Sequence, residues 1–117
     1  MAKFSRTVRL KKNNLRLNQP KKITNKYFLI LFKRQQLSYA RLGIIVGKKY
    51  VKRAVDRNQI KRIVRESFRQ HQEKLKNLDI VVIVRSECST LSTKVWRNDI
   101  DNIWQILVES LKVSQNS

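Results

Sequence analysis

The sequence predicts an α/β (α+β) fold built as a two-layer sandwich, in which a mixed sheet of about four strands is packed with helices. Short apolar runs of strand length alternate with longer stretches in which apolar residues recur at helical spacing. An apolar fraction of 41% is sufficient for a core, and 117 residues suit one compact domain. We therefore expect a single domain over residues 1–117.

The chain begins with a basic and polar segment, residues 1–24, that contains scattered leucines. These leucines, among them Leu15 and Leu17, predict a short helix that ends at Pro20, because the residue before a proline disfavours the α conformation. The core is expected to follow over residues 25–117.

Three segments have the composition of β-strands. Residues 27–32 form an apolar run that suits a strand buried on both faces, and residues 41–47 form a second run that leads into a basic loop. Residues 79–85 are the strongest candidate, because they contain five consecutive β-branched residues. Such a run is typical of a central strand covered on both faces.

Residues 56–71 are predicted to form an amphipathic helix. Asp56 suits the N-cap position, and Gln59 follows three residues later as the second half of a capping box. The apolar residues of the segment have the spacing of a buried stripe. They are Ile60, Ile63, Val64 and Phe68.

The opposite side of this helix is strongly basic. Lys61, Arg65 and Arg69 repeat every four residues, so like charges lie above one another. Asn58 and Arg62 fall on the same arc. Each like-charge pair costs about 0.2–0.5 kcal/mol in an isolated helix. A polyanion that neutralises the repulsion is the simplest reason for the pattern.

A second amphipathic helix is expected between Val95 and Leu111. Its two tryptophans, Trp96 and Trp104, stand eight residues apart on one face. Packing in the core is favoured for them over a platform on which bases stack.

The net charge of +19 indicates a nucleic acid or an anionic membrane as the partner. Residues 1–78 hold 23 lysines and arginines against 3 acidic residues, whereas residues 79–117 hold 4 against 5. The polyanion is therefore expected to meet the first two-thirds of the chain. No apolar run approaches the roughly 20 residues of a spanning helix. The N-terminus lacks an apolar signal core, so a cytoplasmic protein without a membrane partner is expected.

Side chains suited to catalysis are scarce. One histidine, one cysteine and eight scattered carboxylates leave little from which to build a nucleophile with its base, or a metal site. The single cysteine, Cys88, excludes an internal disulfide. Gly43 and Gly47 lack the spacing of a phosphate-binding loop. The sequence therefore predicts no catalytic residue and no metal ligand.

Bidentate arginine contacts favour structured RNA over DNA as the polyanion. Tyr27 and Phe28 offer an aromatic ring from the sheet on which a base could stack. Because neighbouring strand residues face opposite sides, one of these two rings is expected to point into the core.

Residues 41–49 and 51–68 closely resemble the signature of the bacterial ribonuclease P protein subunit. The pattern Arg-Asn-x-x-Lys-Arg-x-x-Arg, which begins at Arg57, is the arginine-rich RNR motif of that family. The strand at residues 78–84 fits as well, and the similarity is looser from there to the C-terminal helix. The basic pattern is specific here because it stands between two matching strands.

The resemblance implies a function that composition does not supply. Members of this family bind the catalytic RNA of ribonuclease P, and the two together remove the 5′ leader of precursor tRNA. The RNA performs the hydrolysis with Mg²⁺ that the RNA holds, and the protein alone binds no cofactor. The same partners are implied for this chain, as a monomer in a 1:1 ribonucleoprotein.

The resemblance also implies where the RNA is bound, namely on the basic helix and on the loop before it. The implied contacts are Arg57, Asn58, Lys61, Arg62 and Arg65 from the motif, Arg69 on the same face, and Lys48, Lys49, Lys52 and Arg53 as supporting cations.

The family fold implies the element order αβββαβα and a left-handed βαβ crossover at the basic helix, against the usual right-handed rule. It further implies a leader cleft between the sheet and the N-terminal helix. Here Leu15 and Leu17 stand where the family usually has phenylalanine, and aliphatic side chains stack poorly on bases. Leader contacts are therefore expected from Tyr27 or Phe28, with Leu15 beside them.

Two other functions stay open at this point. A general RNA-binding or ribosome-associated protein could use the same basic helix. A nuclease that acts alone belongs to a different class, and the shortage of catalytic side chains argues against it.

Overall fold

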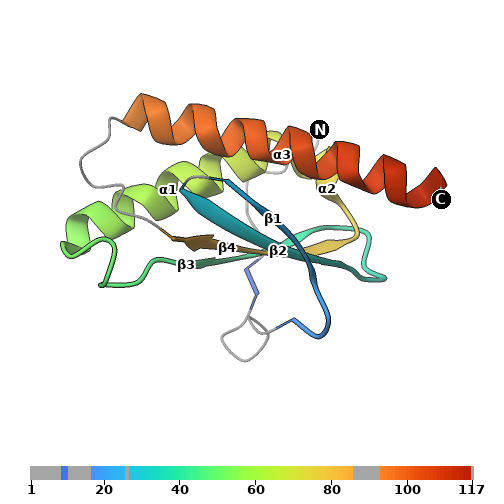
Figure 1. Cartoon of the computed structure of the whole chain (residues 1–117), viewed down its shortest axis with the longest axis horizontal. Coiled ribbons are helices and arrows are strands. Elements are labelled where there is room, and N and C mark those ends of the chain that lie inside the picture. The colour runs from blue at the N-terminus through green and yellow to red at the C-terminus, as the bar shows by residue number, and fades with distance from the viewer. Residues whose placement is uncertain (1–8, 11–16, 26, 86–92, 117) are drawn as a thin grey trace.

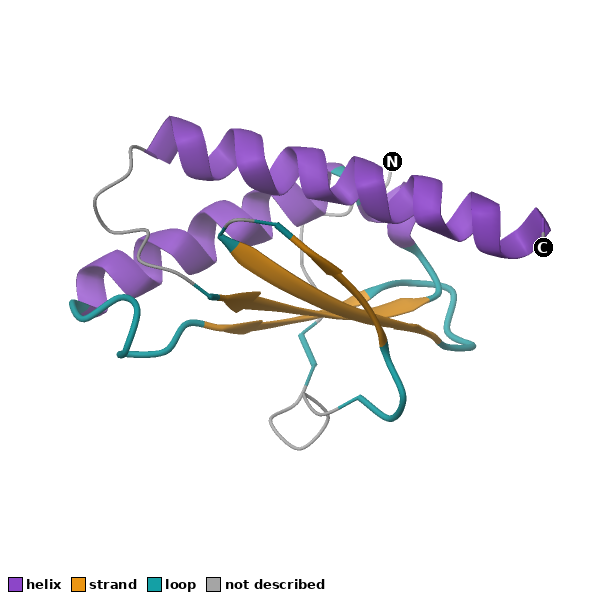
Figure 2. Ribbon diagram, in the orientation of Figure 1, coloured by secondary structure: helices purple, strands orange, loops and turns teal. Residues whose placement is uncertain are grey.

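The computed structural model describes residues 9–10, 17–25, 27–85 and 93–116. The strands form one sheet, and the two long helices lie side by side over one of its faces (Figure 1). Figure 2 shows the same two layers by element type, with the connecting loops at the two ends of the sheet. The predicted α+β two-layer sandwich is therefore confirmed.

The sheet is mixed and has the strand order β1-β2-β4-β3. Strand β2 is antiparallel to both of its neighbours, β1 and β4, whereas β3 and β4 are parallel. The long helix α1 and the short helix α2 connect the two parallel strands, which gives the expected βαβ unit. The left-handed sense of this crossover stays a prediction. The elements are β1 (Lys21–Thr24), β2 (Phe28–Arg34), β3 (Arg41–Ile45), α1 (Ala54–Gln70), α2 (Gln72–Leu75), β4 (Leu78–Val84) and α3 (Thr93–Asn116).

The core lies between the sheet and the two long helices. Alternate residues of β2 and β4 face it, because side chains on a strand point to opposite sides in turn. Phe28, Ile30 and Phe32 on β2 are at most 2% exposed, and Ile80 on β4 is fully buried. Val81, which faces the other side of β4, is fully buried as well. The expectation of a central strand covered on both faces is confirmed at Val81, whereas Asp79 and Ile83 on the same side of β4 are partly exposed.

Phe68 on α1 and Trp104 on α3 join the helices. Their rings meet edge to face, with centroids 5.8 Å apart and planes inclined at 66°. The indole Nε1 of Trp104 donates to the hydroxyl oxygen of Ser67 at 2.8 Å, and that hydroxyl donates to the carboxylate of Asp101. These three polar groups are thus paired with one another. Trp104 is fully buried and Trp96 is 2% exposed, which confirms that both tryptophans pack in the core.

The predicted start of the basic helix was wrong by two residues. Helix α1 begins at Ala54, and Arg53 occupies the N-cap position without a side-chain hydrogen bond to the helix. Asp56 therefore lies inside the first turn and forms no capping box with Gln59. In this position its negative charge still interacts favourably with the positive end of the helix dipole.

The N-terminal segment also differs from the expectation. Residues 17–20 are not helical, and they pass on the side of the sheet away from the helices (Figure 1). Lys21–Thr24, which had been assigned to the segment before the core, forms edge strand β1. Arg9 makes a parallel bridge with Leu42 of β3. Leu15 and the rest of the expected short helix fall on residues 11–16, outside the described residues, so the prediction is untested there.

Replacing Phe68 by alanine should destabilise the protein strongly, because the ring fills the contact between α1, α3 and the sheet. We expect the free energy of unfolding to fall by about 3–5 kcal/mol, as measured by urea denaturation. Ile106→Ala is the matched control, since this side chain is 51% exposed and should change stability by no more than about 0.5 kcal/mol. Equal losses in the two variants would contradict this description of the core.

Candidate nucleic-acid interface

The cations of α1 lie on the side opposite its buried stripe. Arg62 and Arg69 are exposed, as is Asn58, while Lys61 and Arg65 are partly exposed. The stripe itself is buried, with Ile60, Ile63, Val64 and Phe68 at most 5% exposed. The face assignment made from helical spacing is therefore confirmed.

The acidic side chains of the described ranges leave most of this surface unpaired. Their ion pairs with basic side chains are Arg41–Asp79, Glu73–Lys76 and Glu66–Arg97. Within those same ranges, Lys61, Arg62, Arg65 and Arg69 have no carboxylate at salt-bridge distance. The positive charge on α1 is thus held next to solvent, where a polyanion could neutralise it.

Arg65 has the most unusual surroundings among these cations. Burial lowers the pKa of its guanidinium, and the positive charge of Arg9 lowers that pKa further. Arg9 is exposed and lies on the segment that bridges to β3. The cationic surface therefore continues from α1 onto the N-terminal segment. Arg9 was not predicted as part of this surface, because helical spacing relates residues within one element and says nothing about a neighbouring segment.

Arg57 has a structural role as well as its place in the motif. Its Nη1 atom donates to the main-chain oxygens of Val51 and Lys52, at 2.9 and 2.8 Å. These bonds fix the chain just before the helix begins, where two exposed cations, Lys52 and Arg53, precede Ala54. The guanidinium thus braces the loop that carries the supporting cations.

The basic loop continues the surface beyond the N-terminal end of α1. Lys48 and Lys49 are exposed, and the ammonium of Lys49 lies 5.6 Å from the centre of the Tyr50 ring. The main-chain N–H groups of Tyr50 and Val51 both donate to the oxygen of Gly47. Because Val51 is fully buried, the loop is anchored in the core while its lysines stay outside. The loop and the start of α1 lie at the same end of the molecule (Figure 2).

Helix α3 bounds the surface on one side. Arg97 of α3 donates from Nη2 to Oε1 of Glu66 at 2.6 Å, and both side chains are about 40% exposed. Glu66, Arg69, Gln70 and Arg97 line a shallow hollow of about 200 Å³ between the two helices. Glu66 is therefore paired across the contact between the two helices. This pair could not be predicted from the sequence, because its members are far apart in the chain.

The predictions for the residues expected to contact the leader differ in their outcome. Phe28 is fully buried in the core, so its ring is not available at the surface, and that part of the prediction was wrong. The alternation along β2 directs Phe28 toward the helices and leaves Leu29 and Leu31 on the open face of the sheet, where both are partly exposed. Tyr27 is partly exposed and packs against the edge of the core. Leu15 lies outside the described residues.

The described residues contain no group of three histidine, cysteine, aspartate or glutamate side chains placed to hold a metal ion. The helices in the same ranges include none that is long and apolar enough to cross a membrane. His71 follows the last residue of α1, and its Nδ1 atom lies 2.8 Å from the main-chain oxygen of Ser67.

The fold and this surface define a class of small α+β proteins that display one long cationic helix beside a mixed sheet. Residues 4–108 match the family model described as Ribonuclease P. A ribonuclease P protein component from Marinomonas sp. is 44% identical over 90 residues, which cover 76% of this chain and 68% of the relative. One from Pseudomonas aeruginosa is 40% identical over 89 residues, and the match covers 76% of this chain and 66% of that relative's length.

Solved structures agree with this assignment. The ribonuclease P protein of Staphylococcus aureus superimposes with a TM-score of 0.76 at 30% identity, covering 87% of this chain and 96% of that one. The corresponding protein of Thermotoga maritima gives a TM-score of 0.69 at 35% identity, covering 81% and 93% of the two chains. The chain therefore belongs to the bacterial ribonuclease P protein family.

The bracing role of Arg57 can be separated from its charge by a stability measurement. Arg57→Ala removes both hydrogen bonds to the loop, so the free energy of unfolding should fall by about 1–2 kcal/mol in urea denaturation. Arg62→Ala removes the same charge from an exposed position and should change it by no more than about 0.5 kcal/mol. Indistinguishable stabilities for the two variants would show that the brace contributes nothing measurable.

Proposed function

We propose that this chain is the protein subunit of a ribonuclease P in which an RNA carries out the catalysis. In this proposal the protein binds the catalytic RNA and the 5′ leader of precursor tRNA, in a 1:1 ribonucleoprotein. The observation that carries it is the cationic face of α1, which lacks carboxylate partners within the described residues. Membership of the family supplies the context in which that face has a use.

The chemistry of the surface suits RNA phosphates. Lys61 and Arg65 stand one helical turn apart, and the exposed arginines can each fork onto two phosphate oxygens. Contacts of this kind position a protein on a nucleic acid without reading its bases. The proposed RNA contacts are Arg57, Asn58, Lys61, Arg62, Arg65 and Arg69 on the helix, with Lys48, Lys49, Lys52 and Arg53 before it.

The leader is proposed to lie along the open face of the sheet. Leu29, Leu31 and Ile83 are partly exposed on this face, and Ile45 is 38% exposed. Aliphatic side chains of this kind can pack beside a single strand, whereas stacking on its bases requires an aromatic ring. Tyr27 is the remaining aromatic candidate for stacking.

The hydrolysis is proposed to belong to the RNA, which would also hold the Mg²⁺. Several carboxylates of the described residues already have structural partners: Asp79 accepts two hydrogen bonds from Arg41, and Asp99 accepts one from Asn25 at 2.7 Å. Burial raises the pKa of Asp99, which makes its carboxylate a poorer ligand for a cation. The role of the protein side chains is therefore to bind and orient RNA.

A cleavage assay at low Mg²⁺ tests the proposal. Precursor tRNA should be cut faster by the catalytic RNA when the protein is added, and it should not be cut by the protein alone. The double variant Arg62→Ala/Arg65→Ala should need about 10- to 100-fold more protein for the same stimulation, because two charge-assisted contacts are lost. Cutting by the protein alone would contradict the proposal.

The matched control is Lys74→Ala/Lys94→Ala, which removes two exposed cations from outside the proposed surfaces. It should stimulate the RNA as the unaltered chain does, and circular dichroism should show that both double variants are folded. If the unaltered chain binds RNA but does not stimulate cleavage, a general RNA-binding function is favoured instead.

A further inference from the structure

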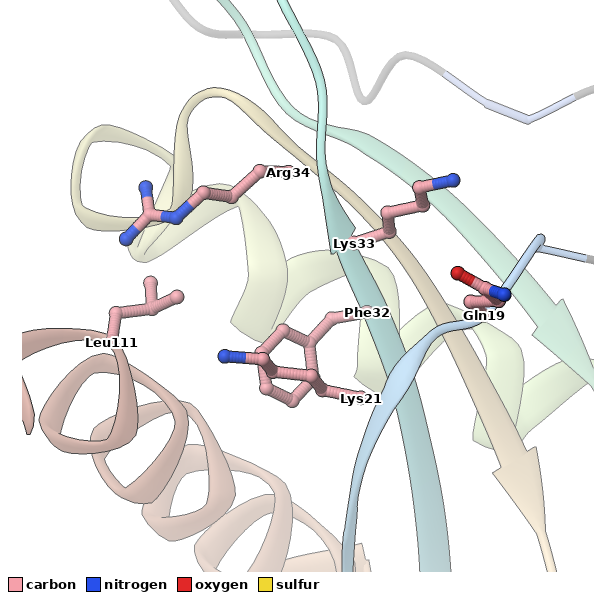
Figure 3. A pocket seen from close by; sticks show the side chains of 6 residues that line it. All are labelled: Gln19, Lys21, Phe32, Lys33, Arg34 and Leu111. Carbon is pink, nitrogen blue, oxygen red and sulfur yellow. The ribbon is translucent and has the colours of Figure 1, made fainter. Parts of the chain in front are cut away.

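A hollow of about 240 Å³ lies between β1, the end of β2 and the C-terminal half of α3. Figure 3 shows its side chains from close by: those of Lys21, Phe32, Arg34 and Leu111 surround one space, whereas those of Lys33 and Gln19 lie on the other side of β2 and point away from it. The lining residues are Gln19, Lys21, Phe32, Lys33, Arg34 and Leu111.

The sheet register explains why these side chains meet. Lys21 and Phe32 are direct partners across the β1–β2 pair, so they lie on the same face of the sheet. Arg34 is two residues beyond Phe32, and two residues along a strand return to the same face. Helix α3 crosses this face and brings Leu111 to the opposite wall (Figure 3).

The hollow has a charged rim and an apolar interior. Lys21 and Arg34 are exposed at the rim, whereas Phe32 is only 2% exposed and forms the floor. Leu111 is partly buried and forms the wall. Two types of surface, one for an anion and one for an apolar group, are therefore joined in one small space.

We propose that this hollow binds one nucleotide of a single-stranded RNA. The phosphate would lie against Lys21 and Arg34, and the base would pack on Leu111 and the edge of Phe32. The volume is below the roughly 300–1,000 Å³ of pockets that enclose drug-sized ligands, which suits a single ring with its phosphate. Arginine guanidinium planes are common stacking partners of unstacked bases in RNA recognition.

The site is separate from the two surfaces used in the proposed function. It lies beside the C-terminal half of α3, at the end of the molecule away from the loop before α1 (Figure 1). It also faces the helix side of the sheet, because Phe32 points toward the core while Leu31 faces the opposite side. The inference rests on the proposed function only in taking RNA as the partner, and it would give the protein a second strand-binding point.

Nuclear magnetic resonance on the isotope-labelled full chain tests the site directly. A short oligouridylate is added, and the methyl resonances of Leu111 are followed. They should shift with saturation, and Arg34→Gln should weaken the affinity read from them by about tenfold. The matched control Arg85→Gln should leave that affinity within about twofold, because it removes the same charge elsewhere at the surface.

Two further arms separate this site from its alternatives. The variant Arg62→Ala/Arg65→Ala should show the same Leu111 titration as the unaltered chain, which keeps the result independent of the α1 surface and of the cleavage assay. Inorganic phosphate alone should shift the Leu111 methyls much less than the oligouridylate does. Unmoved Leu111 methyls, equal effects of Arg34→Gln and Arg85→Gln, or an equal response to phosphate would each overturn the proposal.

Discussion

The packing of α1 against α3 and the sheet is the interaction on which the rest of the structure depends. A helix that buries a stripe on one side is held at a fixed rotation, so the residues on its other side are placed without further contacts. Phe68 and Trp104 supply the apolar part of this packing, and Ser67 with its two hydrogen-bond partners supplies the polar part. The direction in which the cations of α1 point is therefore a consequence of the core.

The same packing accounts for the unneutralised charge. Glu66 lies close to the cations in sequence, and it could neutralise one of them along the helix. Its carboxylate instead pairs with Arg97 of α3, because the helix contact brings that guanidinium within 2.6 Å. At the other end of the helix, Arg57 uses its guanidinium to hold the loop that carries Lys52 and Arg53. One carboxylate is thus paired with α3, and the main chain that carries two of the cations is held in place.

Elements with a clear period were predictable from the sequence, and those that depend on neighbours were not. The apolar stripe of α1 and the β-branched run of β4 each indicate the element type and its buried residues without reference to a neighbouring element. Both predictions are confirmed. Strand β1 has two lysines in four residues, and it is a strand only because β2 pairs with it. The start of α1 was misplaced because the capping pattern at Asp56 takes no account of the loop before it. The guanidinium of Arg57 bonds to main-chain oxygens of that loop, and the helix begins at Ala54.

The residues of the candidate site also divide into those that one element relates to one another and those that a neighbouring element places. The cations of the motif could be predicted because one helix relates them to one another. Which of Tyr27 and Phe28 faces the core was left open, since it depends on the register of β2 with β4. Arg9 could not be found from the sequence, because its place near Arg65 follows from the bridge to β3.

The salt dependence of RNA affinity tests most directly whether the cationic face of α1 neutralises phosphates. The logarithm of the affinity for the catalytic RNA should fall linearly with the logarithm of the salt concentration. For Arg62→Ala/Arg65→Ala the slope should be shallower by about 2, since about one unit is lost for each phosphate contact removed. An unchanged slope in that variant, with the fold intact, would show that these arginines do not meet phosphates and would contradict the account.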